Sequence, residues 1–162
     1  MKTTGVLGGL GPQATMDFEM RLHQVAQRLL PQQANSGYPP MVVYYYRHPP
    51  VLLDETGHPL TPFQPDPRLL EAARALGRLA DFLVITSNGV HMLYDELVQA
   101  AGRPILSLID VTLAEVERRA WRKVGVLAFM SPQVYAQPLE QRQIDFDQSG
   151  STSCRSHRPV RN

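Results

Sequence analysis

Short apolar runs alternate with longer amphipathic stretches along most of this chain. The runs have the length and β-branched content of buried strands, and the stretches repeat apolar residues at helical spacing. Strands are predicted at residues 5–7, 41–46, 82–86, 105–108 and 124–129, and helices at 12–30, 66–79, 91–101, 111–121 and 131–143. Alternating strands and helices predict an α/β fold, with a parallel sheet that carries helices on both faces.

Proline and glycine mark several boundaries of these elements. Asp66 is a candidate helix cap before Pro67, and Gly102 is placed to end the helix over residues 91–101. Eight of the 14 prolines lie between Pro39 and Pro67. Such a segment cannot form a central strand or a long helix, so residues 47–67 are expected to form a loop over the strand ends.

The composition of the chain limits which kinds of partner, such as nucleic acid, zinc or a membrane, the protein is expected to have. The chain has 162 residues, 43% hydrophobic and 19% charged, and its formal net charge is +1, with three arginines and one aspartate in residues 147–162. The remainder is nearly neutral, which argues against a nucleic-acid surface. A single cysteine, Cys154, allows neither an internal disulfide nor a cysteine zinc cluster. No apolar run is long enough to span a membrane, so we expect a cytoplasmic protein without a membrane partner.

The strand over residues 82–86 ends in a polar turn, Ser87-Asn88-Gly89-Val90-His91. Ligands of open α/β sheets bind outside the carboxyl ends of the strands, so Ser87 is a candidate catalytic hydroxyl. The alternative is a serine that only caps the next helix. Asn88 and Gly89 could present backbone N–H groups to a substrate carboxylate. His91 is the nearest candidate base or substrate contact, or else a structural residue at the helix start.

A glycine-rich loop follows the first strand. Gly9, Gly11 and Pro12 introduce a helix whose first N–H groups suit a carboxylate or phosphate. Residues 9–14 match the G-x-G-x-x-A pattern of dinucleotide sites, but Pro12 lacks an N–H, and Arg47 follows the second strand where such sites carry an acidic residue. These residues therefore predict a small anionic ligand, a carboxylate or a phosphate, above the glycine-rich loop.

Together, the two loops resemble the aspartate/glutamate racemase family. That family opens with a Gly-Gly-Met-Gly-Pro type loop before Ala-Thr-x-x-Phe, and residues 8–18 read Gly-Gly-Leu-Gly-Pro-Gln-Ala-Thr-Met-Asp-Phe. Its second landmark, Cys-Asn-Thr-x-His before a helix close to Tyr-Asp-Glu-Leu, matches residues 87–91 and 94–97. The resemblance covers about residues 3–146. It implies a flavodoxin-like lobe and a second, pseudo-symmetric lobe, with the substrate between them.

The resemblance also implies a reaction. Members racemise an acidic amino acid without a cofactor or a metal ion, using one group on each face of Cα to remove and return a proton. Ser87 stands at the position of the first catalytic cysteine. The family's second cysteine, in a Gly-Cys-Thr-Glu type segment, has no counterpart, since Cys154 lies in a different context. Arg47 stands near, but not at, the position of the arginine that holds a substrate carboxylate.

These matches and departures predict the organisation of the chain. We expect a first α/β lobe over residues 1–121, the start of an incomplete second lobe over 122–146, and a disordered basic, serine-rich tail over 147–162. An exposed apolar face on the incomplete lobe could serve as a homodimer contact. Two alternatives to a racemase remain open: a noncatalytic binder of amino acids or carboxylates, and a flavodoxin-like or nucleotide-binding domain.

Overall fold

The computed structural model describes residues 1–34, 36–127 and 133–149, and it divides the chain into two units. The first unit is Met1–Thr112 and the second begins at Leu113. This division falls within a helix, before the boundary that the sequence suggested at residue 121. The first unit contains β1 (Thr4–Gly8), α1 (Pro12–Leu29), β2 (Met41–Tyr45), α2 (Pro67–Leu79), β3 (Phe82–Ile85), the 3-10 helix η1 (Gly89–Leu93), α3 (Tyr94–Ala101), β4 (Ile105–Leu106) and the start of α4 (Leu108–Arg118).

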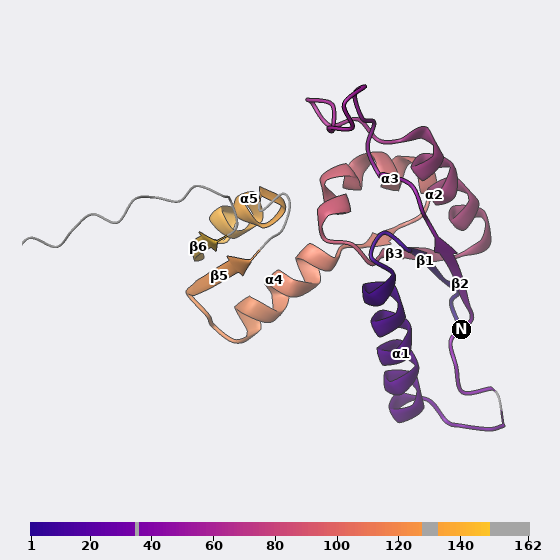
Figure 1. The fold of residues 1–162 in the computed structure, drawn as a ribbon. Helices are drawn as coiled ribbons and strands as arrows, with labels where there is room; N and C mark the ends of the chain where they lie inside the picture. Colours follow the sequence, from indigo (N-terminus) through magenta and orange to yellow (C-terminus); the bar gives the residue numbers. More distant parts are fainter. Residues whose placement is uncertain (35, 128–132, 150–162) are drawn as a thin grey trace, which may run out of the picture. The chain divides into compact units, whose positions relative to one another are not determined.

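Four parallel strands form the sheet of the first unit, in the order β2-β1-β3-β4. Helix α1 lies on one face, and α2 and α3 lie together on the other (Figure 1). This arrangement confirms the predicted α/β class, a parallel sheet with helices on both faces. The order places β2 and β4 at the two edges of the sheet.

The core lies mainly between the sheet and α2. Leu7, Leu69, Leu76, Leu83 and Ile85 are each 0 to 1% exposed. Burying a side chain of this size contributes about 1.5–3 kcal/mol, so the stripe of leucines along α2 is what fixes that helix to the sheet. The described residues contain no helix that is both long and apolar enough to cross a membrane.

The predicted caps of α2 and α3 are confirmed. The Asp66 carboxylate accepts a hydrogen bond from the Arg68 N–H at 2.8 Å, and Pro67 occupies the first position of α2. Gly102 ends α3 in the left-handed conformation, with φ of 60°. A helix cap depends on residues that are close together in sequence, so the ends of these helices can be predicted from the sequence.

Two predicted elements differ in the structure. Residues 91–101 do not form one helix: η1 takes Gly89–Leu93 before α3 begins at Tyr94. The predicted strand over residues 105–108 is only Ile105–Leu106, because the Ser107 hydroxyl accepts a hydrogen bond from the Asp110 N–H at 3.1 Å and so caps the start of α4. The early cap shortens the strand.

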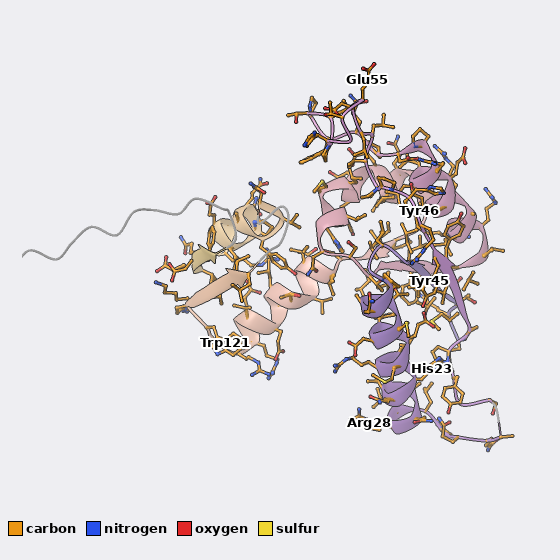
Figure 2. All side chains as sticks on the ribbon, in the orientation of Figure 1. His23, Arg28, Tyr45, Tyr46, Glu55 and Trp121 are labelled. Atoms are coloured by element: carbon orange, nitrogen blue, oxygen red, sulfur yellow. The ribbon has the colours of Figure 1, made fainter. Side chains whose placement is uncertain are left out.

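The proline-rich segment between β2 and α2 is a loop, as predicted, but it has internal order. Two antiparallel bridges, Val51 with Pro65 and Leu53 with Pro59, fold it back on itself. Glu55 lies at its tip (Figure 2). The bridges hold the two ends of this loop together, so that β2 and α2 are joined by a folded segment.

The second unit contains β5 (Lys123–Leu127), α5 (Gln133–Gln141) and β6 (Asp145–Ser149), and β5 and β6 pair in parallel. The prediction of a disordered tail from residue 147 is wrong for 147–149, which continue β6. Their polar side chains do not suggest a strand, but backbone pairing with β5 does not depend on side-chain polarity. The rest of the predicted tail, with Cys154, lies outside the described residues.

Candidate active site at the carboxyl edge of the sheet

Strand register brings the predicted site residues to one edge of the sheet. Leu7 pairs with Ile85, and Gly8 pairs with Tyr45. One step further along the parallel strands, Gly9 therefore lies between the ends of β2 and β3, with Arg47 and Ser87 on either side. The glycine-rich loop, the residues after β2 and the turn after β3 meet there, as the sequence predicts.

Gly9 is fixed by close packing of backbone against backbone. Its φ is +81°, and a Cβ at this position would lie 2.7 Å from Tyr45 Cα and Tyr46 N. The Tyr46 N–H also donates to the Gly8 carbonyl at 2.8 Å. The Gly9 N–H already donates to a hydroxyl, so it is not available to bind a substrate carboxylate.

That hydroxyl belongs to Thr15, in the first turns of α1, which is 0% exposed. Its Oγ1 accepts from the Gly9 N–H at 2.9 Å, lies 3.3 Å from the Gly11 carbonyl, and lies 2.8 Å from Thr86 Oγ1. The Thr15–Thr86 hydrogen bond thus ties the glycine-rich loop to the end of β3. The sequence analysis selected neither Thr15 nor Thr86 as a site residue, because residues 71 apart give no local signal of a contact.

The start of α1 is suited to an anion. Gly11 is the N-cap residue with φ of −129°, and Pro12 is the first helical residue. The N–H groups of Gln13 and Ala14 lie in the first turn, where a helix has no acceptors of its own, and the positive end of the helix dipole adds to their attraction for a carboxylate. That first turn carries no acidic residue.

Arg47 adds a full positive charge above the same loop. Its Nη1 donates to the Gly9 carbonyl over 3.4 Å, and the side chain is otherwise exposed. A single hydrogen bond of this length holds the guanidinium weakly, so that the group can turn toward a carboxylate. Arg47, Gly9 and the first turn of α1 are therefore neighbours, as the prediction of a carboxylate site requires.

Ser87 is half-buried at the end of β3, and its hydroxyl has no hydrogen-bond partner among the residues that the structure describes. Its carbonyl, in contrast, accepts a hydrogen bond from His91 Nδ1 at 2.8 Å. Gly89 opens η1, and a Cβ there would meet nothing within 4 Å. Asn88 is exposed at the same turn. The backbone of this turn is held, while the hydroxyl of Ser87 is not.

His91 is buried and both of its ring nitrogens are occupied. Nδ1 must donate to the Ser87 carbonyl, because a carbonyl can only accept, and Nε2 accepts from the Leu108 N–H at 3.1 Å. Burial lowers the pKa of the imidazole, despite raising effects from Ser87, Asn88 and Asp110. The ring is therefore neutral and has no nitrogen left for Ser87 or a substrate. This corrects the expectation that His91 contacts substrate or serves as a base.

No dinucleotide or metal chemistry is evident at this edge. Pro12 removes one of the N–H groups that a pyrophosphate would need, and Thr15 takes another, that of Gly9. Within the described ranges, no group of three or more His, Cys, Asp and Glu is arranged to hold a metal ion. What the edge offers is the first turn of a helix, a cation and a hydroxyl.

Comparison with known proteins places the chain among amino-acid racemases. Residues 7–160 match the family model for Asp/Glu/hydantoin racemases. The chain is 26% identical over 126 residues to the broad specificity amino-acid racemase RacX of Bacillus subtilis (strain 168), a match that covers 74% of this chain and 52% of the relative. The chain thus spans about half the length of that enzyme.

Solved structures show the same fold. A crystal structure of an aspartate racemase homologue from Pyrococcus horikoshii OT3 aligns with a TM-score of 0.73 at 22% identity, covering 93% of this chain and 65% of that one. The aspartate racemase of Picrophilus torridus aligns with a TM-score of 0.65 at 21% identity, covering 91% and 62%. At this identity the likeness establishes fold alone.

Proposed function

This chain belongs to the Asp/Glu/hydantoin racemase family, and from that premise we propose that it acts on a small acidic amino acid by cofactor-independent transfer of the Cα proton. The observation that carries the proposal is the meeting of three features at one edge of the sheet. Arg47 and the first turn of α1 form an anion site beside Gly9, and Ser87 follows the neighbouring strand. Ser87 occupies the position of the cysteine in the Cys-Asn-Thr-x-His motif.

In this proposal the substrate carboxylate lies between Arg47 and the N–H groups of Gln13 and Ala14. A charge-assisted hydrogen bond to the guanidinium and the helix dipole favour the ionised carboxylate. Holding the carboxylate there would bring Cα toward Ser87, across the width of one strand. Gly11 and Pro12 shape the loop, while Asn88 and Gly89 border the substrate on the opposite side.

Ser87 would exchange a proton with one face of Cα, and a second group would act on the other face. That second group does not come from His91, whose nitrogens are both engaged. A hydroxyl is a much weaker acid than a thiol, whose unperturbed pKa is about 8.5. Serine at this position therefore favours slow proton transfer.

A second function, noncatalytic binding of an amino acid or another carboxylate, is favoured by one observation. Within the described part of the chain, no basic group forms a hydrogen bond with the Ser87 hydroxyl. An unactivated hydroxyl can donate a hydrogen bond to a ligand but is a poor proton acceptor. Binding would then use Arg47 and the start of α1 without exchange at Cα.

One experiment separates the two functions. The protein is incubated with L- and D-aspartate and L- and D-glutamate in deuterated water, and Cα deuteration is followed by NMR. A racemase incorporates deuterium, the Ser87→Ala variant loses at least about 100-fold of that rate, and Ser87→Cys exceeds the wild type. Ser107→Ala, the same change at the end of β4, serves as the control and retains the rate.

Binding is measured in parallel by thermal stabilisation with the same amino acids. Stabilisation that is lost in Arg47→Gln, without any deuteration, would identify a binder and refute the racemase. Deuteration that persists in Ser87→Ala would refute the role of Ser87. If neither stabilisation nor deuteration occurs, both proposals are wrong.

A further inference from the structure

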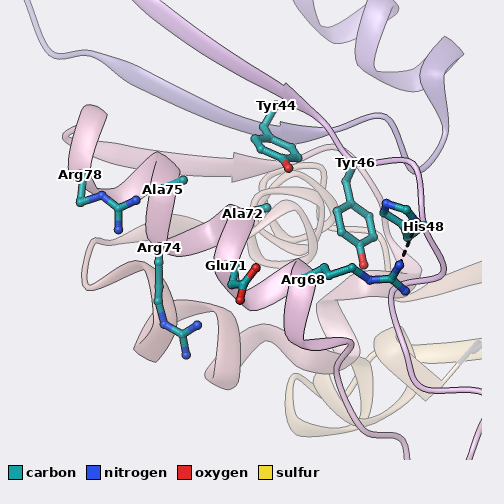
Figure 3. A pocket seen from close by; sticks show the side chains of 9 residues that line it. All are labelled: Tyr44, Tyr46, His48, Arg68, Glu71, Ala72, Arg74, Ala75 and Arg78. Carbon is teal, nitrogen blue, oxygen red and sulfur yellow. Dashed lines mark hydrogen bonds between the residues drawn. The ribbon is translucent and has the colours of Figure 1, made fainter.

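A second pocket of about 470 Å³ lies between β2 and α2, within the first unit (Figure 3). One face of α2 lines it, because residues three and four apart in a helix share a face. Ala72 and Ala75 stand in the middle of that face, and Arg68 and Arg78 stand toward its two ends. The small alanines leave a hollow between longer cationic side chains.

The pocket reaches the carboxyl edge at one end, through Tyr46 and His48, and extends away from that edge along α2. Tyr44, on its opposite wall, lies within β2 before the strand ends. Helix α2 runs back across the sheet and ends at Leu79, shortly before β3 starts at Phe82, so Arg78 lies toward the amino edge. A ligand between Tyr44 and Arg78 would therefore not compete with one above Gly9.

Charge in the pocket is predominantly positive. Its lining includes Arg68, Arg74 and Arg78, with Glu71 as the one carboxylate. Arg68 is already paired with Asp66, through Nη2 to Oδ2 at 2.6 Å and Nε to Oδ1 at 3.0 Å. Neither Arg74 nor Arg78 forms a hydrogen bond or an ion pair with any residue in the described ranges. Two arginine side chains without a partner among the described residues therefore line one hollow.

The wall opposite these arginines is aromatic. Tyr44 is 43% exposed, and Figure 3 shows its ring across the hollow from Ala72 and Ala75. Tyr46 is 2% exposed and donates to the Pro49 carbonyl at 3.1 Å, so its hydroxyl is already used. The Tyr44 ring and the alanine floor form an apolar slot with cations at its rim. A flat ring fits between such surfaces, and an anionic substituent reaches the guanidinium groups.

We propose that this pocket binds a small organic anion with a flat ring, whose carboxylate or phosphate pairs with Arg74 and Arg78 while the ring packs against Tyr44 and Ala75. The volume is within the range of small-molecule sites. Carboxylate and phosphate share this chemistry, since a guanidinium offers two parallel N–H donors to either. The inference does not depend on the proposed racemase function, because the residues that it assigns to the ligand, Tyr44, Arg74, Ala75 and Arg78, are not those proposed to hold the racemase substrate.

The test uses the full chain and two ring-bearing anions, adenosine monophosphate and naphthalene-2-carboxylate, with uncharged adenosine as the reference. Binding is measured by isothermal titration calorimetry. At least one of the two anions should bind. If phosphate is the group recognised, adenosine should bind at least about tenfold more weakly than adenosine monophosphate. The double variant Arg74→Gln/Arg78→Gln should lose at least about tenfold in affinity for the anion that binds. The anion that binds more tightly identifies the recognised group.

The matched control is Arg21→Gln/Arg28→Gln on α1, which removes the same charge from exposed helical positions. It should leave affinity unchanged. Equal loss in both double variants would show nonspecific attraction to net charge and overturn the site. So would the absence of binding for both anions at millimolar concentration. Tyr44→Ala provides an independent check, since it should weaken ring-bearing anions while leaving both arginines in place.

Discussion

Replacing Thr15 with valine should strongly destabilise the first unit, although the substitution exchanges only one hydroxyl for a methyl group. Valine keeps the volume and β-branching of threonine, and both fit an α-helix. What is lost is one hydroxyl that serves three partners: the Gly9 N–H, the Gly11 carbonyl and the Thr86 hydroxyl. Packing is therefore nearly constant, and the experiment isolates hydrogen bonding.

The magnitude follows from burial. A buried donor left without an acceptor costs about 1–3 kcal/mol, and the Gly9 N–H would be such a donor. Loss of the hydrogen bond to Thr86 adds about 0.5–1.5 kcal/mol. Thr15→Val should therefore lower the free energy of unfolding by about 1.5–4.5 kcal/mol, a large part of the stability of an ordinary domain.

Thr112→Val is the matched control. The Thr112 hydroxyl also donates to the carbonyl four residues earlier, Leu108, at 2.8 Å, but it is exposed and serves no other partner. Because water can replace that bond, the control should change stability by no more than about 0.5 kcal/mol. The comparison sets one helical threonine against another, with only burial and the extra partners differing.

The assay should report on the first unit. Trp121, the one tryptophan of the chain, belongs to the second unit, so its fluorescence is the wrong probe. Urea unfolding followed by far-UV circular dichroism gives the midpoint and the slope, and hydrogen exchange of the Gly9 amide gives local opening. A Thr15→Val midpoint no lower than that of Thr112→Val would refute the reasoning. Thr86→Val completes a double-mutant cycle, which should show coupling of about 0.5–1.5 kcal/mol with Thr15→Val.

Three further predictions test other parts of the fold. Gly9→Ala and Gly57→Ala both place a side chain at positive φ, but only a Cβ at residue 9 meets the backbone at the end of β2. Gly9→Ala should therefore cost about 1–3 kcal/mol more than Gly57→Ala in urea unfolding. Equal costs would contradict the close packing of Gly9 against Tyr45 and Tyr46. Burial holds the pKa of His91 in the folded protein below its ordinary value of 6.5, so on acidification the imidazole of the unfolded chain takes up a proton first. The difference in free energy of unfolding between wild type and His91→Gln should therefore shrink as pH falls from about 7.5 to 5. A difference that does not vary with pH would exclude a neutral, buried ring. Asp66→Ala should cost about 1–2 kcal/mol in thermal unfolding through loss of the α2 cap. Asp66→Asn should cost less, because its amide oxygen can still accept from the Arg68 N–H; equal costs would place the stabilisation in the ion pair with Arg68, which both variants remove.

Local signals account for what the sequence predicted well. The apolar runs at β1 and β3, the Asp66–Pro67 helix start and the Gly102 helix end all depend on neighbours in sequence, and the structure has each of them. The carboxyl edge was predictable for a different reason. In a parallel sheet, every strand end reaches the same edge, so placing the strands also places the loops that follow them.

The contacts that were missed all depend on tertiary structure. The Thr15–Thr86 hydrogen bond and the capture of the Leu108 N–H by His91 join segments 71 and 17 residues apart. Strand β6 was missed because its sequence, Asp-Phe-Asp-Gln-Ser, carries little strand propensity, and pairing with β5 defines it. Side-chain type alone does not distinguish a histidine that acts as a base from one that links two backbones.

The same contacts separate the scaffold of the candidate site from its chemistry. The Ser87 carbonyl accepts a hydrogen bond from His91, whose other ring nitrogen accepts from the Leu108 N–H at the start of α4. The residue before Ser87, Thr86, is hydrogen-bonded to Thr15 of α1. None of these bonds involves the Ser87 side chain. A change from hydroxyl to thiol at this position therefore alters the acidity of one group and leaves the hydrogen bonds that position it intact. For that reason, comparing serine with cysteine at residue 87 measures proton transfer rather than folding, and it makes this position the most direct point at which to test the proposed reaction.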